Sequence, residues 1–526
     1  MGSRRIYNIK NMRIPFTIDS IFEGISPAQY YAVKGGYSAS IGIDPDMPVD
    51  NTAVKISGYL RPTAMEKISG TTITSSPLWI VTNPKNTNAY VYDLGGKVYT
   101  LDTSLTVTAL NSGTALTSSA GNGSDYYDNY LYFAKNTDIC RYGPLNGSPA
   151  FDEDYWTSAP LSKTALTDTT YPTIRGYEMP NHVMHRHTDN KIYFCDVTTA
   201  NKGVLHYIKT SKTTVEGDTN DGSSYTALDF GYGYYPTTIE TYETQLAVAL
   251  IEGVSTTLKQ KPAALTFWDT TAVTFQKLIQ VEFPDPLITA MKNVNGALYV
   301  WSGNANGGVR LSRFYGGYTF EELWYDPEGY PPLQGAVDAE MNRVVWGGVT
   351  TYPEASVSVF ARGSRSAQLG TGVHNILKTT SAGANGYVSA IKYLQTTSNA
   401  LRQPIVGWKD DSGTGLDKSS TTYGTSVWRS EVFRVGRPFQ IRKLRIPLAQ
   451  AVGANMTATV KIYTDNGSTA TTITTINNTD YSGKRCVAVY PQVNGEQDFF
   501  VEIRWTGTAL MTVALPITGI IETVED

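Results

Sequence analysis

The stretch Asp128-Asn-Tyr-Leu-Tyr-Phe-Ala134 carries the pattern that decides the fold. Two turn-forming polar residues come first, and aliphatic and aromatic side chains then follow, as in a strand that leaves a tight turn. The same pattern returns along the chain. Its other members are Asp189-Asn-Lys-Ile-Tyr-Phe-Cys195, Glu243-Thr-Gln-Leu-Ala-Val-Ala249, Asn295-Gly-Ala-Leu-Tyr-Val-Trp301, Met341-Asn-Arg-Val-Val-Trp346 and, as a candidate earlier member, Pro77-Leu-Trp-Ile-Val81.

The aliphatic markers of these segments recur at a nearly even spacing. They are Leu78, Leu131, Ile192, Leu246, Leu298 and Val344, about 46 to 61 residues apart. A four-stranded propeller blade takes about 40–50 residues, so the spacing predicts six blades. Tyr387-Val-Ser-Ala-Ile-Lys-Tyr393 with Pro404-Ile-Val-Gly-Trp408 is a candidate seventh. The alternative is a series of hairpins in two or three sandwiches, which rarely keep so steady a spacing.

Hairpins are predicted throughout. A second strand follows the later markers, at residues 139–142, 204–208, 264–268, 309–314 and 357–360, and is expected to pair with the marker strand. Two-residue turn signals lie at Gly95-Gly96, Asn295-Gly296, Asn466-Gly467 and Asn494-Gly495. Few stretches show a helical period. The chain is therefore expected to be mainly β.

The chain changes character near residue 425. Short strands then follow at roughly 10-residue spacing, which is typical of a sandwich; they include residues 427–433, 441–446, 458–463, 485–490, 499–505 and 510–515. We expect an extended N-terminal arm over residues 1–70, a six- to seven-bladed β-propeller over 71–424 and a C-terminal β-sandwich over 425–526. The blade count stays open, because the arm could pair with the last strand and close one blade.

Composition excludes several classes of protein. The 526 residues include 43 basic and 47 acidic ones, with no basic block, which disfavours binding driven by nucleic-acid phosphates. No apolar run approaches the roughly 18 residues of a membrane span, and no apolar stretch follows the basic N-terminus, so we expect no signal peptide. Cys140, Cys195 and Cys486 lie far apart and are expected to be thiols of a reducing compartment.

Three of the five histidines lie in Asn181-His-Val-Met-His-Arg-His187. In a strand His185 and His187 would face the same side, with Asp189 two residues further, and these ligand types suit zinc or iron. The other interpretation is a half-exposed strand. No second cluster supplies further ligands, so we predict no metal or cofactor. Whether His182, His185 and His187 bind a metal stays open.

Catalytic motifs are missing. We find no G-x-S-x-G, P-loop, H-E-x-x-H or C-x-x-C, and no catalytic residue or enzyme activity is predicted. Residues 216–222 differ from a calcium loop in the place of their glycine and, like residues 410–417, are interpreted as a surface loop. The tyrosine-rich residues 125–130 and 230–236 could stack on sugars or line an interface, or simply be good strand formers.

A resemblance to a known class lies at the N-terminus. Tyr31-Ala-Val-Lys-Gly-Gly-Tyr37, Ile43-Asp-Pro-Asp-Met-Pro48 and Ser57-Gly-Tyr-Leu-Arg-Pro62 run in order ahead of the hairpins. This order resembles the opening of tailed-bacteriophage structural proteins, whose arms pass through a Pro turn to a Gly-x-x-Arg-Pro stretch before a propeller. Ser430-Glu-Val-Phe-Arg-Val-Gly-Arg-Pro-Phe439, leading to Lys461-Ile-Tyr-Thr-Asp465, is similar to sandwich modules of such virion proteins.

Among these proteins the chain looks most like the nozzle or hub of short-tailed phages. The resemblance implies a non-enzymatic part of the virion tail, assembled in the host cytoplasm into a ring of like subunits. Its implied role is to conduct DNA and to dock fibres or other tail proteins, and a slightly acidic chain suits DNA that slides past. Two alternatives stay open: a tail protein that binds a receptor or host glycan, and a propeller glycosidase, which would need paired carboxylates.

Overall fold

The protein is mainly β, as predicted. A computed structural model describes residues 11–19, 24–25, 36–46, 58–83, 88–117, 123–135, 138–156, 182–198, 202–209, 226–252, 262–271, 275, 280–304, 307–314, 316, 319–340, 343–349, 357–361, 372–395, 402–467 and 469–524. Over these residues strand follows strand, and one short α-helix, α1 (Asn478–Tyr481), interrupts them. The chain divides into two compact units: residues 1–65, 360–378 and 420–526 form the first, and residues 66–359 and 379–419 the second.

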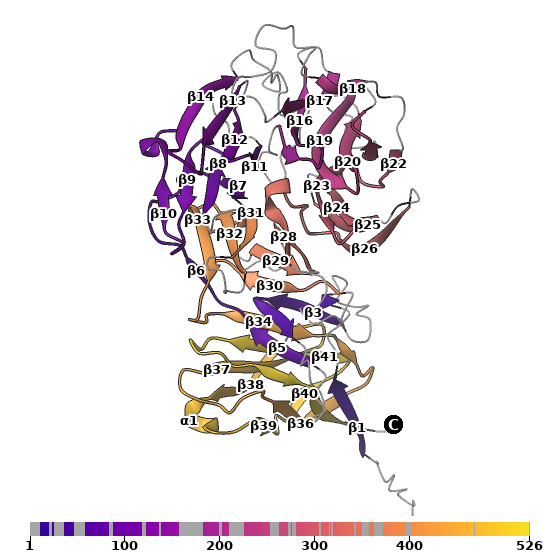
Figure 1. The fold of residues 1–526 in the computed structure, drawn as a ribbon. Helices are drawn as coiled ribbons and strands as arrows, with labels where there is room; N and C mark the ends of the chain where they lie inside the picture. Colours follow the sequence, from indigo (N-terminus) through magenta and orange to yellow (C-terminus); the bar gives the residue numbers. More distant parts are fainter. Residues whose placement is uncertain are drawn as a thin grey trace, which may run out of the picture. The chain divides into compact units, whose positions relative to one another are not determined.

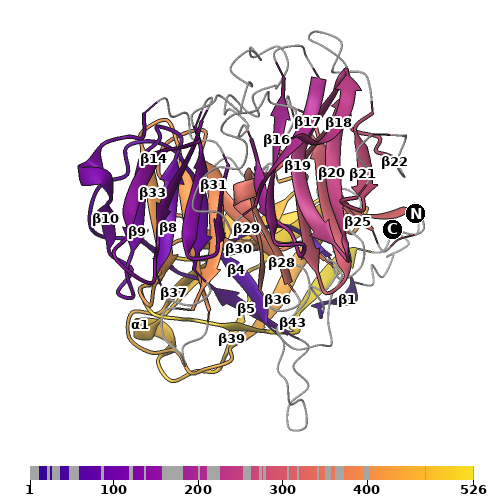
Figure 2. The ribbon, with the colours of Figure 1, turned by 45° about the horizontal axis from the view of Figure 1, so that its top comes forward.

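Six four-stranded sheets follow one another along the chain, each with its strands in chain order (Figures 1 and 2). The first three sheets hold β7 (Pro77–Thr82), β8 (Ala89–Asp93), β9 (Val98–Leu101) and β10 (Val107–Ala109); β11 (Ser124–Tyr127), β12 (Tyr130–Ala134), β13 (Ile139–Gly143) and β14 (Ala150–Trp156); and β15 (Met184–Arg186), β16 (Lys191–Val197), β17 (Lys202–Lys209) and β18 (Thr226–Tyr232).

The next three sheets repeat this order. They hold β19 (Tyr234–Tyr242), β20 (Gln245–Glu252), β21 (Ala264–Trp268) and β22 (Gln280–Glu282); β23 (Leu287–Val294), β24 (Ala297–Gly303), β25 (Val309–Phe314) and β26 (Phe320–Asp326); and β27 (Val337–Glu340), β28 (Arg343–Val349), β29 (Val357–Ala361) and β30 (Asn375–Lys378). Consecutive four-stranded sheets of this kind are typical of a β-propeller.

The seventh sheet takes its fourth strand from far upstream. Its order is β31 (Tyr387–Leu394), β32 (Gln403–Lys409), β33 (Thr414–Ser419) and then β6 (Met65–Lys67). The backbone amide of Ile68 continues this pairing by donating to the carbonyl of Leu416 at 2.8 Å. The first strand of each sheet contacts the first strand of the next, from β7 to β31, and β31 contacts β7. The series of first strands therefore returns to its beginning.

Most predicted hairpins are confirmed. The five strands expected to pair with marker strands do so: β13 with β12, β17 with β16, β21 with β20, β25 with β24 and β29 with β28. Leu78, however, lies in β7, a first strand, whereas the later markers lie in second strands. At Asn295-Gly296 both residues have positive φ, at 52° and 81°, as a tight turn between right-twisted strands requires.

The turn predicted at Asn494-Gly495 is wrong. These residues belong to β40 (Val493–Gly495), which pairs with β36 (Phe439–Pro447). A Cβ atom at Gly495 would collide with the ring of Phe439. Glycine is therefore required at position 495 because the Phe439 side chain packs against the backbone there, and not because the chain turns.

The first unit combines strands from both ends of the chain. One sheet has the order β1 (Asn11–Ile18), β43 (Ile517–Val524), β36 and β39 (Cys486–Val489), with β40 also on β36. A second has the order β2 (Gly24–Ile25), β3 (Gly36–Ile41), β34 (Ser426–Ser430), β41 (Asp498–Trp505), β37 (Thr457–Thr464) and β38 (Thr469–Asn477), with β35 (Phe433–Arg434) on β41. The third is β4 (Ile43–Asp46), β5 (Gly58–Pro62) and β42 (Val513–Leu515).

The N-terminal stretch differs from the extended arm that we expected. Its strands β1, β3 and β5 pair antiparallel with β43, β34 and β42. Because each paired strand satisfies its backbone N–H and C=O groups in a shared ladder, these three strands are integral to the sheets of the first unit.

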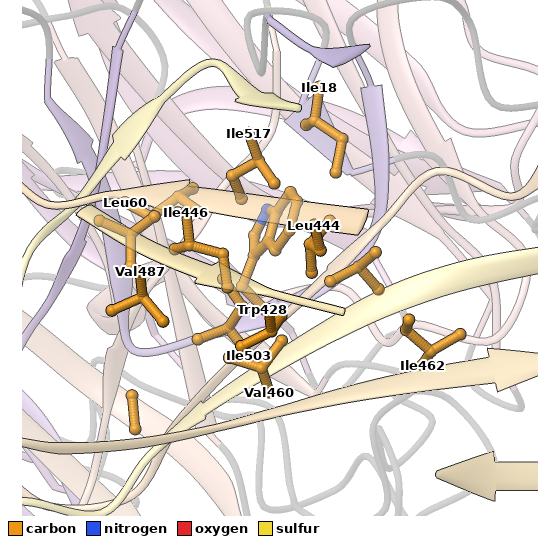
Figure 3. Close-up of a cluster of buried hydrophobic side chains, with 14 of the residues drawn as sticks. Ile18, Leu60, Trp428, Leu444, Ile446, Val460, Ile462, Val487, Ile503 and Ile517 are labelled. Atoms are coloured by element: carbon orange, nitrogen blue, oxygen red, sulfur yellow. The ribbon is translucent and has the colours of Figure 1, made fainter. Parts of the chain in front are cut away.

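Alternating side chains build the core of the first unit (Figure 3). In β37, Ala458, Val460 and Ile462 are fully buried, while the residues between them are half-buried. Their neighbours in the same cluster come from both larger sheets, including Trp428, Ile503, Leu444, Ile446, Val487 and Ile517. Period-2 alternation of this type places one face of each sheet against a shared core.

Ile503→Ala tests this core. Ile503 is fully buried and lies opposite Trp428 and Val460 on its two neighbouring strands. We expect the substitution to lower the free energy of unfolding by about 3 kcal/mol, because it removes three buried carbon atoms and leaves a cavity. Urea denaturation followed by tryptophan fluorescence measures the loss. Ile503→Val is the matched control and should cost about 1 kcal/mol; equal losses for the two variants would contradict this packing.

Candidate functional site

Ionisable side chains recur at one position of the first strands. In three of them a bulge leaves one residue without a partner in the second strand: Thr237 in β19, Thr289 in β23 and Ser389 in β31. The third residue after each bulge is charged, and these residues are Glu240, Lys292 and Lys392. In β7 the skipped residue is Leu78 and the third residue after it is Val81. A bulge at the same position of each strand turns the equivalent side chains in the same direction.

The other three first strands each add one ionisable residue. Asp125 lies in β11, His185 in β15 and Asp338 in β27. Together with Glu240, Lys292 and Lys392 they form one electrostatic network, because each of the six charges or dipoles shifts the pKa of another member or has its own pKa shifted by one. We refer to Asp125, His185, Glu240, Lys292, Asp338 and Lys392 as the six-residue cluster. It is the densest group of interacting charges in the described part of the second unit, and we take it as the candidate site.

Asp338 is the anchor of the cluster. Its carboxylate lies 3.3 Å from Lys392 Nζ and 4.0 Å from Lys292 Nζ, and it accepts a 2.9 Å hydrogen bond from the amide of Tyr393. Burial opposes ionisation, but Lys392 and Lys292 outweigh it and hold the pKa of Asp338 below its usual range. Asp338 is therefore a carboxylate that two lysines share.

His185 and Glu240 form the other half of the cluster. His185 Nε2 accepts the amide hydrogen of Thr241 at 3.0 Å and lies 3.7 Å from Glu240 Oε1. Burial lowers the pKa of His185 to about 4 even though Asp125 is near, so the imidazole is neutral at pH 7, with its proton on Nδ1. Burial also raises the pKa of Glu240, and Lys292 offsets only part of this effect.

A short turn lies against the same strands. Gln334, at the start of the 3-10 turn η5 (Gln334–Ala336), accepts hydrogen bonds from Thr238 Oγ1 at 2.6 Å and from the Met291 amide at 2.8 Å. Its Nε2 donates to the Met291 carbonyl at 3.0 Å. Gly335 lies so close to the Leu78 carbonyl that a Cβ atom would collide with it. One turn therefore contacts first strands from distant parts of the series.

The cluster brings charged groups of both signs together. At neutral pH three carboxyl groups face two ammonium groups, and each carboxyl has a partner in the cluster or a backbone amide, as Asp125 does with Arg186 at 2.7 Å. Three side chains remain accessible to water, with 21% exposure for His185, 26% for Lys292 and 29% for Lys392. The arrangement can hold neighbouring sheets together and can exchange protons through Glu240 and His185.

The structure separates the three histidines of residues 182–187. His185 Nε2 and His187 Nδ1 lie 2.8 and 3.0 Å from Thr241 Oγ1, so the two side chains face the same side, as predicted. His182 instead lies 3.3 Å from Asp196, which also contacts His206 at 3.2 Å. Among the described residues, no group of three His, Cys, Asp or Glu side chains could hold a metal ion.

The other candidate residues take structural positions. Tyr126 and Tyr127 are buried, and Tyr130 stacks on the guanidinium of Arg141, whereas Tyr232 is 69% exposed. Residues 410–413 form the turn between β32 and β33. Hydrogen bonds from Ser381 and Ser412 outweigh burial and hold the pKa of Asp410 well below its usual range. Residues 216–222 lie outside the described residues.

The six-residue cluster was missed from the sequence, although a signal for it exists. Four of its members, Asp125, Glu240, Lys292 and Asp338, lie six residues before the markers Leu131, Leu246, Leu298 and Val344, and His185 lies seven before Ile192. Aligning the repeats on their markers brings these ionisable residues into one column. Composition alone could not single them out among 47 acidic and 43 basic residues.

Comparison with known proteins gives only distant likenesses. No family model and no curated protein matches the chain. Among solved structures, streptogramin B lyase is 13% identical, with 68% of this chain and 97% of that chain covered and a TM-score of 0.36. The WD40 β-propeller domain of Doa1 is 11% identical, with 68% and 97% covered and a TM-score of 0.37. The computationally designed protein Ika8 is 11% identical, with 70% and 97% covered and a TM-score of 0.35.

In the part of the chain that the structure describes, no helix has the length and apolar character needed to cross a membrane.

Asp338→Asn tests the anchor of the cluster. The amide removes the negative charge that Lys292 and Lys392 share, so we expect the free energy of unfolding to fall by about 2 kcal/mol. Thermal and urea denaturation at pH 7 measure the change. Asp411→Asn is the matched control, because Asp411 is exposed in a nearby turn, and it should change stability by less than about 0.5 kcal/mol. Equal effects would contradict the role of Asp338.

Glu240→Gln tests the pH dependence. Because the folded protein raises the pKa of Glu240, it retains the proton in a range where the unfolded chain has lost it. Wild-type stability should therefore fall as pH rises through this range, whereas the glutamine variant does not titrate. We expect the variant to be more stable at pH 7.5, by about 1 kcal/mol, and to lose this advantage near pH 4.

Melting temperatures from pH 4 to 8 check this expectation. Glu243→Gln is the control, since Glu243 is exposed in the following turn. A Glu240→Gln variant that is less stable than wild type at pH 7.5, or that keeps the wild-type pH profile, would contradict the effect of burial on Glu240.

Proposed function

We propose that the seven four-stranded sheets form a closed seven-bladed β-propeller and that the three remaining sheets belong to a β-sandwich completed by N-terminal strands. The return of the first strands from β31 to β7, and the contribution of β6 to the seventh sheet, support a closed ring of blades. The core shared by the two larger sheets supports the sandwich.

We further propose that the chain is a non-enzymatic structural component of a bacteriophage tail, a nozzle or hub that forms a ring, conducts DNA and docks other tail proteins. The observation that carries the non-enzymatic part is the six-residue cluster. Asp338 is held between Lys292 and Lys392, whereas acid–base catalysis needs a carboxyl pair that is available to a substrate. The tail assignment rests on the resemblance of the N-terminal and C-terminal segments to virion proteins.

A receptor- or glycan-binding tail protein is the second candidate. Tyr232 favours it, because its ring is 69% exposed and Lys202 Nζ lies 5.1 Å from the ring centroid. An exposed aromatic ring beside a hydrogen-bond donor can stack on a sugar. The glycosidase alternative has no such observation in its favour.

Light scattering coupled to size exclusion, with negative-stain images of the same peak, tests the ring. We expect a closed ring of copies, either alone or after addition of a tail protein that neighbours it. Circular dichroism of the same fractions serves as the control that the sample is folded. A folded monomer that never assembles, and that binds glycans in a manner abolished by Tyr232→Ala, would contradict the nozzle and support the second candidate.

A further inference from the structure

Most of the charged side chains on the outer face of the β1–β43–β36–β39 sheet are cationic. Phe16, Ile18, Ile441, Leu444 and Ile521 point into the core, so the alternate residues of these strands point outward. A bulge between Ile441 and Lys443 places both Arg442 and Lys443 on this outer face. Four of the outward residues are cationic and one is acidic: Arg13, Arg442, Lys443, Arg445 and Glu522. We call them, together with Tyr490, the basic face.

The single carboxylate of the basic face is already paired. Glu522 is largely buried and forms an ion pair with Arg442, and it also lies opposite Arg13 in the sheet. Lys443 and Arg445 lie beyond it, opposite Ile520 and Thr518 of β43, which carry no charge. Arg445 and Arg13 are exposed. The face therefore keeps an excess of about three positive charges on a chain whose net charge is −4.

An exposed aromatic ring adjoins these cations. Tyr490 follows β39 directly and is 68% exposed, and Lys443 Nζ lies 6.0 Å from its ring centroid. Arg445 is held beside it, because its Nε donates to Cys486 Sγ at 3.0 Å and its backbone is in register with Ala488. Ala488, the partner of Arg445 in β39, is small.

The opposite end of the same sheet has a different character. Asp465 and Glu496 join Arg442, Glu522 and Asn494 around a hollow of about 540 Å³. Acidic groups thus border the face on the side of β40, and Lys443 and Arg445, which have no carboxylate opposite them in the sheet, lie on the side of β39 and Tyr490. An anionic partner would meet the face there.

We propose that the basic face binds nucleic acid through its phosphates, with Tyr490 stacking on a base. Cations beside an exposed aromatic ring are the combination that binds single strands without regard to sequence. An acidic protein segment would use the cations but would gain nothing specific from the ring. The proposal deepens the proposed role in DNA conduction and rests on it only for the choice of DNA; binding is measurable whether or not the protein forms a ring.

Fluorescence anisotropy with the full-length protein tests the proposal. The probes are a labelled 30-nucleotide thymidine strand and a labelled 30-base-pair duplex, in 20 to 200 mM NaCl. With about two phosphate contacts, we expect the logarithm of the association constant to fall with the logarithm of salt concentration with a slope of about −1.4 for the single strand and about −1.8 for the duplex.

Two variants separate the parts of the face. Lys443→Glu with Arg445→Glu should weaken both probes at least about tenfold at 50 mM NaCl and make the salt slope shallower by one or more. Tyr490→Ala should weaken the single strand by roughly tenfold and leave the duplex unchanged. Lys461→Glu with Arg402→Glu makes the same charge change on other surfaces and should leave both affinities within about twofold of wild type.

Three results would overturn the proposal. They are absence of binding at 20 mM NaCl, an equal loss in the Lys461/Arg402 control, and competition by poly-glutamate as effective as that by an oligonucleotide of equal charge. The last would indicate an acidic protein partner. A protein that forms rings but binds neither probe would contradict nucleic-acid binding by the basic face and leave the proposed structural role in place. A monomer that binds the probes would support nucleic-acid binding and contradict the ring.

Discussion

Antiparallel pairing between strands from distant ends of the chain is the constraint on which both units depend. In the second unit β6, at residues 65–67, completes the sheet of β31–β33. In the first unit β1, β3 and β5 pair with strands that come after residue 425. An edge left without these partners would expose a row of unpaired N–H and C=O groups. The short strands of each sheet are stable only as members of the completed set.

The six-residue cluster is a second product of the same pairing. Its residues lie on six first strands spread from residue 125 to residue 392, and they meet because each first strand contacts the next. Ion pairs in a partly buried setting are strong only when their geometry is fixed, and the repeated bulge in β19, β23 and β31 supplies that geometry. Gln334 adds a bond between β19 and β23 at the level of Thr238 and Met291.

Local pattern in the sequence was enough to predict the strands and most hairpins, because alternation and turn residues act over fewer than ten residues. It placed the second and third strands of five sheets correctly, from Leu131 to Val344. It raised the possibility that the arm closes one blade, but it could not single out β6 as the partner of β33 or β43 as the partner of β1, because partners hundreds of residues apart leave no mark on either strand alone. The charged positions were hidden for a related reason: each is ordinary in its own strand, and only the superposition of repeats reveals the column.

The position of β33 has a consequence for how the protein is made. The seventh sheet needs residues 65–67 and residues 414–419 together, so the nascent chain must hold β6 without its partner while more than three hundred residues are synthesised. Contacts of such long sequence separation slow folding and prolong exposure of partly built sheets. The earlier sheets, whose strands are local, can form as they emerge. Ribosomal pausing or a chaperone acting late in translation would therefore influence yield more than any event near the start.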